Sequence, residues 1–185
     1  MKEREFTYII IFLIGFSILG CVQQEPVDSN ADVPTGDPPF PSQREYGIHD
    51  PNRIVSKQTI AIANEILERL NDDGIAQVAV LVQYNVHHPE DYATHYGRYI
   101  GLGHRDKDNG LVYLIRPDVD PKDKRITVSI GRGLPRFTAI DAHQAMKGAA
   151  MDYINMGDYD NGIMNLVKNT DKRLREIYVG GKNGG

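Results

Sequence analysis

Two kinds of hydrophobic pattern alternate along residues 46–178 and predict an α/β fold. In residues 57–71 the apolar side chains recur at helical spacing, and Ser56 is placed to cap the helix. Residues 75–84 are apolar almost throughout, which is typical of a strand that is buried on both faces. Residues 89–99 begin with a proline, which suits the first turn of a helix, and place tyrosines along one side.

The remaining pattern predicts two more strands and two more helices. The strands are expected at 110–116 and 125–131, and the helices at 141–155 and 161–177. A helix joins the first two strands, so they should be parallel, whereas a short turn-rich loop joins the second and third, so they should be antiparallel. The expected fold is therefore a three-layer α/β/α sandwich with a small mixed sheet.

The first 20 residues are predicted to be a targeting segment. Lys2 and Arg4 precede an apolar run at 8–19, which is short for a membrane span but suits a signal peptide. The run ends in "ILGC", which resembles the lipobox of secreted lipoproteins, so we expect Cys21 to be lipidated after cleavage. An uncleaved anchor is the alternative. Either way, the domain should be held at the extracytoplasmic side of the cell membrane by its N-terminal anchor.

The segment at 21–45 is rich in proline and has few large apolar residues, so it is expected to be an extended tether. The domain should cover residues 46–178, and 179–185 should be a flexible tail. The net charge is −4 and no basic stripe is visible, so we expect no nucleic-acid partner.

The predicted topology brings several acidic loops to one edge of the sheet. Asp72 and Asp73 precede the first predicted strand, Asp106 and Asp108 precede the second, and Asp141 follows the third. Because the first two strands are parallel and the third runs back, these loops should lie at the same edge. Acidic loops from distant parts of the sequence are therefore expected to converge there.

Asp108, Asn109 and Asp141 are the candidate metal ligands at this edge. Calcium prefers carboxylate and carbonyl oxygens on flexible loops, and these residues supply them. The alternative is that Asp108 and Asn109 only make a turn before Gly110, and that Asp141 only caps a helix. The residue pattern leaves both interpretations open.

Several catalytic motifs are excluded or unsupported. The segment at 118–129 begins like an EF-hand, but Asp123 replaces the required glycine and Ser129 replaces the final glutamate. No Gly-x-Ser-x-Gly motif occurs, and the only cysteine belongs to the leader, so no nucleophile can be assigned. His104 lies near the acidic edge and could orient a phosphate group.

The order and spacing of five short segments resemble the TPM domain family over residues 46–178. These segments are "HDPNRIVS", "IGLGHRDKDNGLVYLI", "RITVSIGRGL", the helix start at Asp141, and "GDYDNGI" at 157–163. The sequence departs from the family pattern at Arg53, where glycine is usual, and at Pro135, where glutamate is frequent.

The resemblance implies an exported or membrane-tethered α/β/α domain that binds Ca²⁺ in some members. It adds Asp50, which matches an aspartate of the family, to the candidate metal ligands. It also implies an accessory domain that assists the assembly or maintenance of membrane protein complexes. The alternative is a weak metal-dependent acid phosphatase, an activity proposed for the plastid branch of the family.

Overall fold

The computed structural model describes residues 33–42 and 45–180. Within these ranges the chain forms four strands, five α-helices and one short 3₁₀ turn. In chain order the elements are β1 (Gly47–His49), α1 (Lys57–Asp72), β2 (Gln77–Val82), α2 (Pro89–Tyr99), β3 (Gly110–Ile115), η1 (Pro121–Asp123), β4 (Ile126–Ile130), α3 (Ala139–Met146), α4 (Ala149–Asn155) and α5 (Tyr159–Tyr178).

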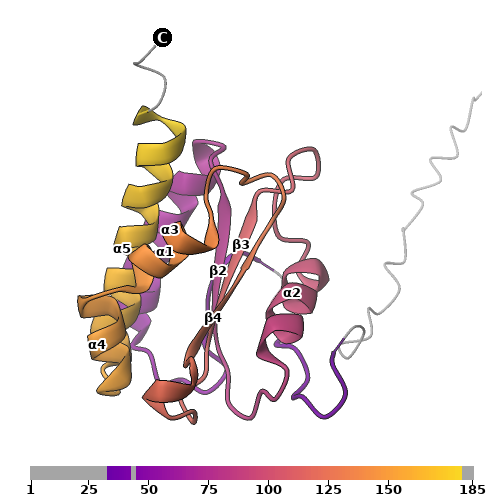
Figure 1. Cartoon of the computed structure of the whole chain (residues 1–185), viewed down its shortest axis with the longest axis vertical. Helices are drawn as coiled ribbons and strands as arrows, with labels where there is room; N and C mark the ends of the chain where they lie inside the picture. Colours follow the sequence, from indigo (N-terminus) through magenta and orange to yellow (C-terminus); the bar gives the residue numbers. More distant parts are fainter. Residues whose placement is uncertain (1–32, 43–44, 181–185) are drawn as a thin grey trace, which may run out of the picture.

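The strands form one mixed sheet in the order β1-β2-β3-β4. The pairs β1–β2 and β2–β3 are parallel, and β3–β4 is antiparallel, with Val112 opposite Ser129. Helices α1, α3, α4 and α5 cover one face, and α2 covers the other (Figure 1). The three-layer α/β/α sandwich with a mixed sheet is thus confirmed.

Each face of the sheet has its own apolar core. The larger core lies under α1 and α5 and includes Leu67 and Leu166. The smaller core lies under α2 and is built around Tyr92 and Tyr96, which are fully buried. Since β2 and β3 send side chains into both cores, their residues are buried almost without exception.

Two local features differ from the sequence prediction. A short strand, β1, adds a fourth member to the sheet, and its three residues carry too little pattern to be recognised. The helix expected at 141–155 is divided into α3 and α4, because Gly148 has a φ of 67° and interrupts the helical path.

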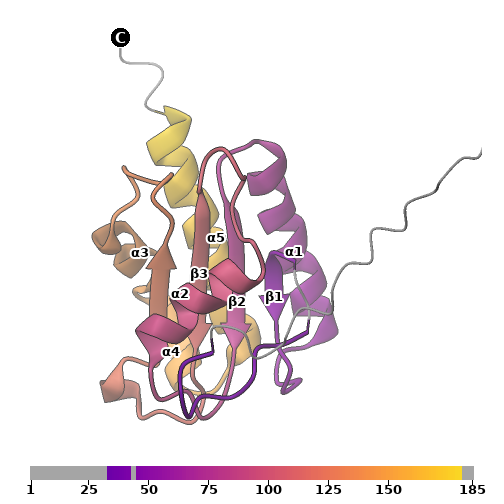
Figure 2. The same cartoon turned by 90° about the vertical axis from the view of Figure 1, so that its right-hand side faces the viewer.

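Part of the predicted tether packs against the domain. Phe40 is only 3% exposed and its ring lies 4.8 Å from that of Tyr92. Asp37 accepts hydrogen bonds from the backbone N–H groups of His87 and His88, at the start of α2. Residues 33–42, which we call the strap, therefore differ from the expected extended tether and run along α2 (Figure 2).

The predicted leader at 1–20 and Cys21 lie outside the described residues, as does most of the predicted tail. Among the helices of the described ranges, none is long and apolar enough to cross a membrane.

His49 is a buried polar side chain at the end of β1. It is 1% exposed, and its Nδ1 is hydrogen-bonded to the Tyr96 hydroxyl of α2. Burial away from water lowers the pKa of His49 from 6.5 to about 4. The imidazole is thus neutral in the folded domain at neutral pH, and it links the sheet to α2.

We expect Phe40→Ala to detach the strap from α2. Truncating a buried phenylalanine costs about 3 kcal/mol or more, which should lower the free energy of unfolding measured with urea. Limited proteolysis within 33–45 should accelerate in parallel. Ser42→Ala, at an exposed position of the same strap, is the control and should change neither quantity. Unchanged proteolysis in Phe40→Ala would contradict the docked strap.

The stability of the domain should fall on acidification because of His49. Its folded pKa of about 4 lies below its unfolded value of 6.5, so the unfolded chain takes up the proton first as the pH falls. The loss begins below about pH 6.5 and levels off near pH 4, and it amounts to about 3 kcal/mol. Urea unfolding at pH 7, 5.5 and 4 measures it. In His49→Asn this component should be missing, and an equally steep decline there would assign it to other groups.

Candidate functional site

The predicted convergence of acidic loops is found at the edge where β2 and β3 begin. The acids there are not gathered around a common point, and three of the five are paired with arginines instead. The pairs are Asp73 with Arg175 at 2.6 Å, Asp108 with Arg132 at 3.1 Å, and Asp141 with Arg173 at 2.6 Å. The charges of these three acids are therefore largely neutralised by side chains of the same chain, whereas Asp72 and Asp106 form no ion pair among the described residues.

Asp141 is engaged through both of its carboxylate oxygens. One oxygen accepts the backbone N–H and the hydroxyl of Thr138, which forms a capping box at the start of α3. The other accepts Nε and Nη2 of Arg173, from α5. Burial alone would raise the pKa of Asp141, but the hydrogen bonds from Thr138 and Arg173 hold it below its usual value.

Asn109 fastens the loop that precedes β3. Its side chain is buried, and its Oδ1 accepts hydrogen bonds from the backbone N–H and the Nδ1 of His104. Its Nδ2 donates to the carbonyl of Ile75, in the turn before β2. Asn109 therefore holds residues 103–109 against the neighbouring turn, in a role that a sequence pattern does not distinguish from a metal ligand.

Asp50 lies at the opposite edge of the sheet. It directly follows β1, which is parallel to β3, whereas Asp108 precedes β3. One oxygen of Asp50 accepts the backbone N–H of Val55 at 2.7 Å and shapes the loop that leads to α1. The structure thus brings Asp108, Asn109 and Asp141 to one edge and separates Asp50 from them.

In this arrangement the four predicted ligands do not form a shared calcium site. Asp141 is held by Thr138 and Arg173, and the amide of Asn109 is turned toward His104 and Ile75. Within residues 33–42 and 45–180, no group of three His, Cys, Asp or Glu side chains is placed to hold a metal ion. Calcium binding stays a prediction, and it would require these contacts to open.

A cleft of about 770 Å³ opens beside this edge, between the end of α2, the loop at 101–108 and the end of β4. Asp108 lines it, whereas Asn109 lines a smaller cavity of about 410 Å³ on the other side of the same loop. Basic side chains predominate in the larger cleft. Its basic lining residues are Arg98, His104, Arg105 and Arg132.

Two glycines after β4 allow the walls of the cleft to meet. The N–H groups of Gly131 and Gly133 donate to the carbonyls of Gly110 and Asp108, which extends the β3–β4 ladder beyond the strands. A Cβ atom at either position would collide with a carbonyl oxygen, that of Asp108 or that of Lys107. This close approach explains the Gly-x-Gly pattern in physical terms and positions Arg132 beside Asp108.

The sequence prediction did not identify the cationic lining of this cleft. Arg98, Arg105 and Arg132 belong to three segments that are isolated along the chain. Only His104 was placed near this edge, and its imidazole is bonded to Asn109. The cationic lining could have been predicted from the arginines that the loops next to the acidic edge also carry.

Comparison with known proteins decides the family. The profile of the TPM domain matches residues 48–173, which is more than half of the chain. The chain belongs to the TPM domain family. A comparison with curated protein sequences gives no match.

Solved structures show the same fold as this TPM domain. The N-terminal domain of a protein from P. gingivalis is 18% identical, with a TM-score of 0.60, and the match covers 69% of this chain and 81% of that one. The BA42 protein from Bizionia argentinensis is 11% identical, with a TM-score of 0.52 and coverage of 69% and 86%. The N-terminal domain of the cg2496 protein from Corynebacterium glutamicum is 14% identical, with a TM-score of 0.51 and coverage of 72% and 82%.

We expect Arg173→Met to strengthen any binding of calcium to the TPM domain through Asp141. The substitution removes a charged hydrogen-bond donor from that carboxylate, a contact worth about 1.5–3 kcal/mol, so affinity should rise on the order of tenfold. Calorimetric titration with CaCl₂ measures the change. Arg175→Met, on the same helix but paired with Asp73 and Asp171, is the matched control.

Two results would contradict the calcium prediction in different ways. Equal affinity in the wild type and Arg173→Met would show that Asp141 is not a ligand. No saturable heat in either protein up to millimolar calcium would remove the metal site altogether.

Proposed function

We propose that this TPM domain is a membrane-tethered accessory domain on the extracytoplasmic side, which binds and assists membrane protein complexes. The observation that carries the proposal is the cleft of about 770 Å³ at the loop edge. Its volume lies within the range typical of binding sites, and it is formed by three segments that the fold brings together. The predicted leader at 1–20, followed directly by Cys21, supports the membrane tether.

The contacts inside the cleft favour binding over chemical turnover. The hydroxyls of Thr94 and Ser129 bond to each other at 3.0 Å, and the Nδ1 of His104 bonds to Asn109 at 3.0 Å. The bond at Nδ1 leaves Nε2 as the basic nitrogen, but among the described residues no hydrogen bond joins His104 to either hydroxyl, and the two hydroxyls bond to one another. A general base and an attacking hydroxyl would need to be in mutual contact.

The strap leaves the cleft accessible. Asp37 bonds to His87 and His88 at the amino-terminal end of α2, whereas the cleft opens at the carboxy-terminal end, beside Arg98. Phe40 of the strap also reaches Tyr99, the last residue of α2, with the ring centroids 5.1 Å apart, but no strap residue lines the cleft. A partner can therefore approach the cleft, which suits a domain that is held at a membrane and binds a neighbouring protein.

We expect a photo-crosslinking residue at position 106, in the exposed loop beside the cleft, to capture a membrane protein. The full-length chain is produced in its own host, irradiated in intact cells, and analysed by blue-native gels and mass spectrometry. Position 57, an exposed lysine at the start of α1, provides the matched control and should give no such product.

If lipid at Cys21 is the anchor, Cys21→Ala should abolish the crosslink in the same cells, because the domain then loses its attachment, whereas an unchanged crosslink would indicate the uncleaved anchor. Equal capture from positions 106 and 57 would contradict a binding face at this edge. A chain that forms no complex, and whose purified form hydrolyses phosphomonoesters in an Asp108-dependent manner, would instead favour the phosphatase alternative.

A further inference from the structure

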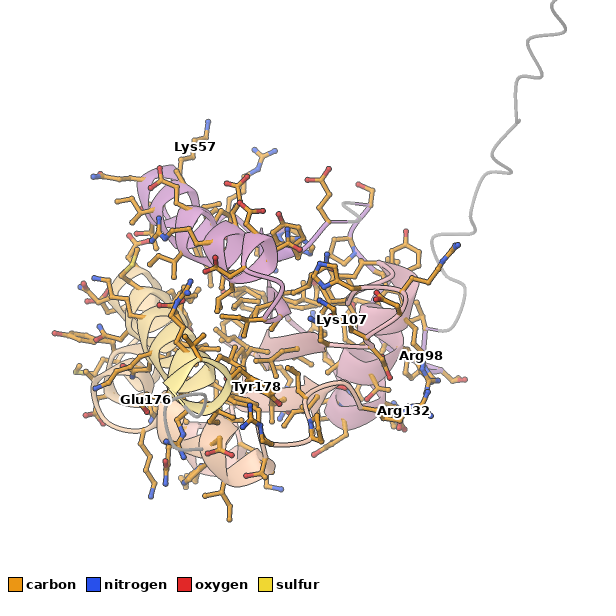
Figure 3. All side chains as sticks on the ribbon, turned by 90° about the horizontal axis from the view of Figure 1, so that it is seen from above. Lys57, Arg98, Lys107, Arg132, Glu176 and Tyr178 are labelled. Carbon is orange, nitrogen blue, oxygen red and sulfur yellow. The ribbon has the colours of Figure 1, made fainter. Side chains whose placement is uncertain are left out.

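The lining of the cleft is positively charged although the chain as a whole is acidic. The net charge of the chain is −4, yet the cleft combines Arg98 from the end of α2, Arg105 from the loop and Arg132 from the end of β4. Asp108 is the single acid among the described lining residues. Figure 3 shows Arg98 and Arg132 on the same side of the molecule, well away from Lys57. The cleft is therefore a local site for an anionic ligand.

These arginines are available to a ligand. Within residues 33–42 and 45–180, Arg98 and Arg105 take part in no ion pair or side-chain hydrogen bond, and both are exposed. Arg132 contacts Asp108 at 3.1 Å, but its side chain is 96% exposed. Such a solvent-exposed pair is weak and can open at little cost. Three guanidinium groups can thus turn toward an incoming anion.

A free strand edge borders the same cleft. β4 pairs with β3 on one side, and no strand of the described ranges pairs with its other side. The register places Ser129 opposite Val112 and Ile130 opposite Leu111, and the N–H of Gly131 donates to Gly110. In an antiparallel pair, hydrogen-bonded positions alternate, so the backbone groups of Val128 and Ile130 point away from β3. They form an unpaired row next to the arginines.

We propose that the cleft binds an extended acidic peptide segment of a partner protein, which adds as a strand to the free edge of β4. Main-chain hydrogen bonds to Val128 and Ile130 supply affinity for an extended backbone, as in other strand-addition sites. The partner's Asp or Glu side chains meet Arg98, Arg105 and Arg132, whose planar groups bind carboxylates in bidentate fashion. The inference rests on the proposed binding function and specifies the ligand of that cleft.

The cleft has both an unpaired strand edge and a group of arginines, and this combination favours a peptide over a simple anion. A phosphate or sulfate ion can use the arginines, but it has no backbone to pair with β4. A neutral peptide can pair with β4, but it leaves the guanidinium groups without a counter-charge. Only an acidic peptide uses both features, which lie together along Ser129 to Arg132.

The first test is fluorescence anisotropy with a labelled peptide of alternating Glu and Val residues, compared with a Gln-for-Glu peptide. Wild-type protein should bind the acidic peptide at least tenfold more tightly than the neutral one. The double variant Arg98→Gln and Arg105→Gln should lose at least tenfold in affinity for the acidic peptide. The double variant Lys57→Gln and Lys168→Gln, which removes two exposed lysines from the other side of the sheet, should bind like the wild type.

The second test asks whether the backbone of β4 takes part. Amide hydrogen exchange followed by NMR should slow at Val128 and Ile130 when the acidic peptide is added. Ile130→Pro removes one outward N–H at an edge position, where proline is tolerated, and should weaken peptide binding while the thermal midpoint shows a folded domain. If that variant is unfolded, the exchange measurement alone decides.

Three outcomes would overturn the inference. The first is equal affinity for the acidic and neutral peptides. The second is unchanged exchange at Val128 and Ile130 in the saturated complex. The third is full displacement of the peptide by inorganic phosphate at millimolar concentration, which would indicate a simple anion site. Crosslinking from position 106 without peptide binding would refute this ligand class and retain the proposed binding function. Peptide binding without crosslinking would retain the ligand class and refute the proposed binding of a membrane protein in cells.

Discussion

The two central strands, β2 and β3, are apolar on both faces, so each face of the sheet must be covered by other elements. The rest of the structure depends on how these two faces are covered. On one face α1 and α5 are long enough to cover the sheet. On the other face, α2 is the only helix of the described ranges, and it has 11 residues. The strap adds Phe40 to that cover, and beyond Tyr99 the side chains of Ile100 and Leu102 pack on the same core. The cleft thus lies where the short helix ends and a loop continues the cover of the sheet.

Electrostatics at the loop edge follow from how its acids are partnered. A carboxylate that accepts a guanidinium and two capping hydrogen bonds, as Asp141 does, has little remaining capacity for a cation. Asp73 and Asp141 are neutralised by arginines of α5, and Asp108 is paired with Arg132. Among the described residues Arg98 and Arg105 form no ion pair, so the exposed charge beside the cleft is positive. An acidic sequence can therefore present a cationic site.

Strong periodic patterns made the main elements predictable from the sequence, and weak or isolated signals accounted for the differences. The bounds of α2 agree with the expectation at both ends, because Pro89 fixes its start and the tyrosines mark its buried side. The break between α3 and α4 depends on a backbone angle at Gly148 that a helical pattern does not reveal. Phe40 is a single aromatic residue among prolines, and only the tertiary structure shows the pocket that receives it.

The position of the candidate site in the fold could be predicted from the sequence, but the chemical role of its side chains could not. Topology alone brought the loops carrying Asp73, Asp108 and Asp141 to one edge of the sheet. Whether a carboxylate there faces an ion, a helix terminus or an arginine is decided by side-chain contacts over several ångströms. Arg173 and Arg175 come from the last helix, more than 30 residues after Asp141, and no spacing rule links them to these acids.

The docked strap changes how far the domain can stand from a membrane. If lipid is attached at Cys21, only the residues from 22 to 32 separate the anchor from the strap at Val33. A chain extends by at most about 3.6 Å per residue, so this connection spans no more than about 40 Å. An unfolded tether through residue 45 would reach about twice as far. On the proposed attachment, the strap would keep the domain within reach of proteins that project modestly from the bilayer, and no strap residue lines the cleft. A domain attached in this way would leave its cationic cleft accessible to a neighbouring protein.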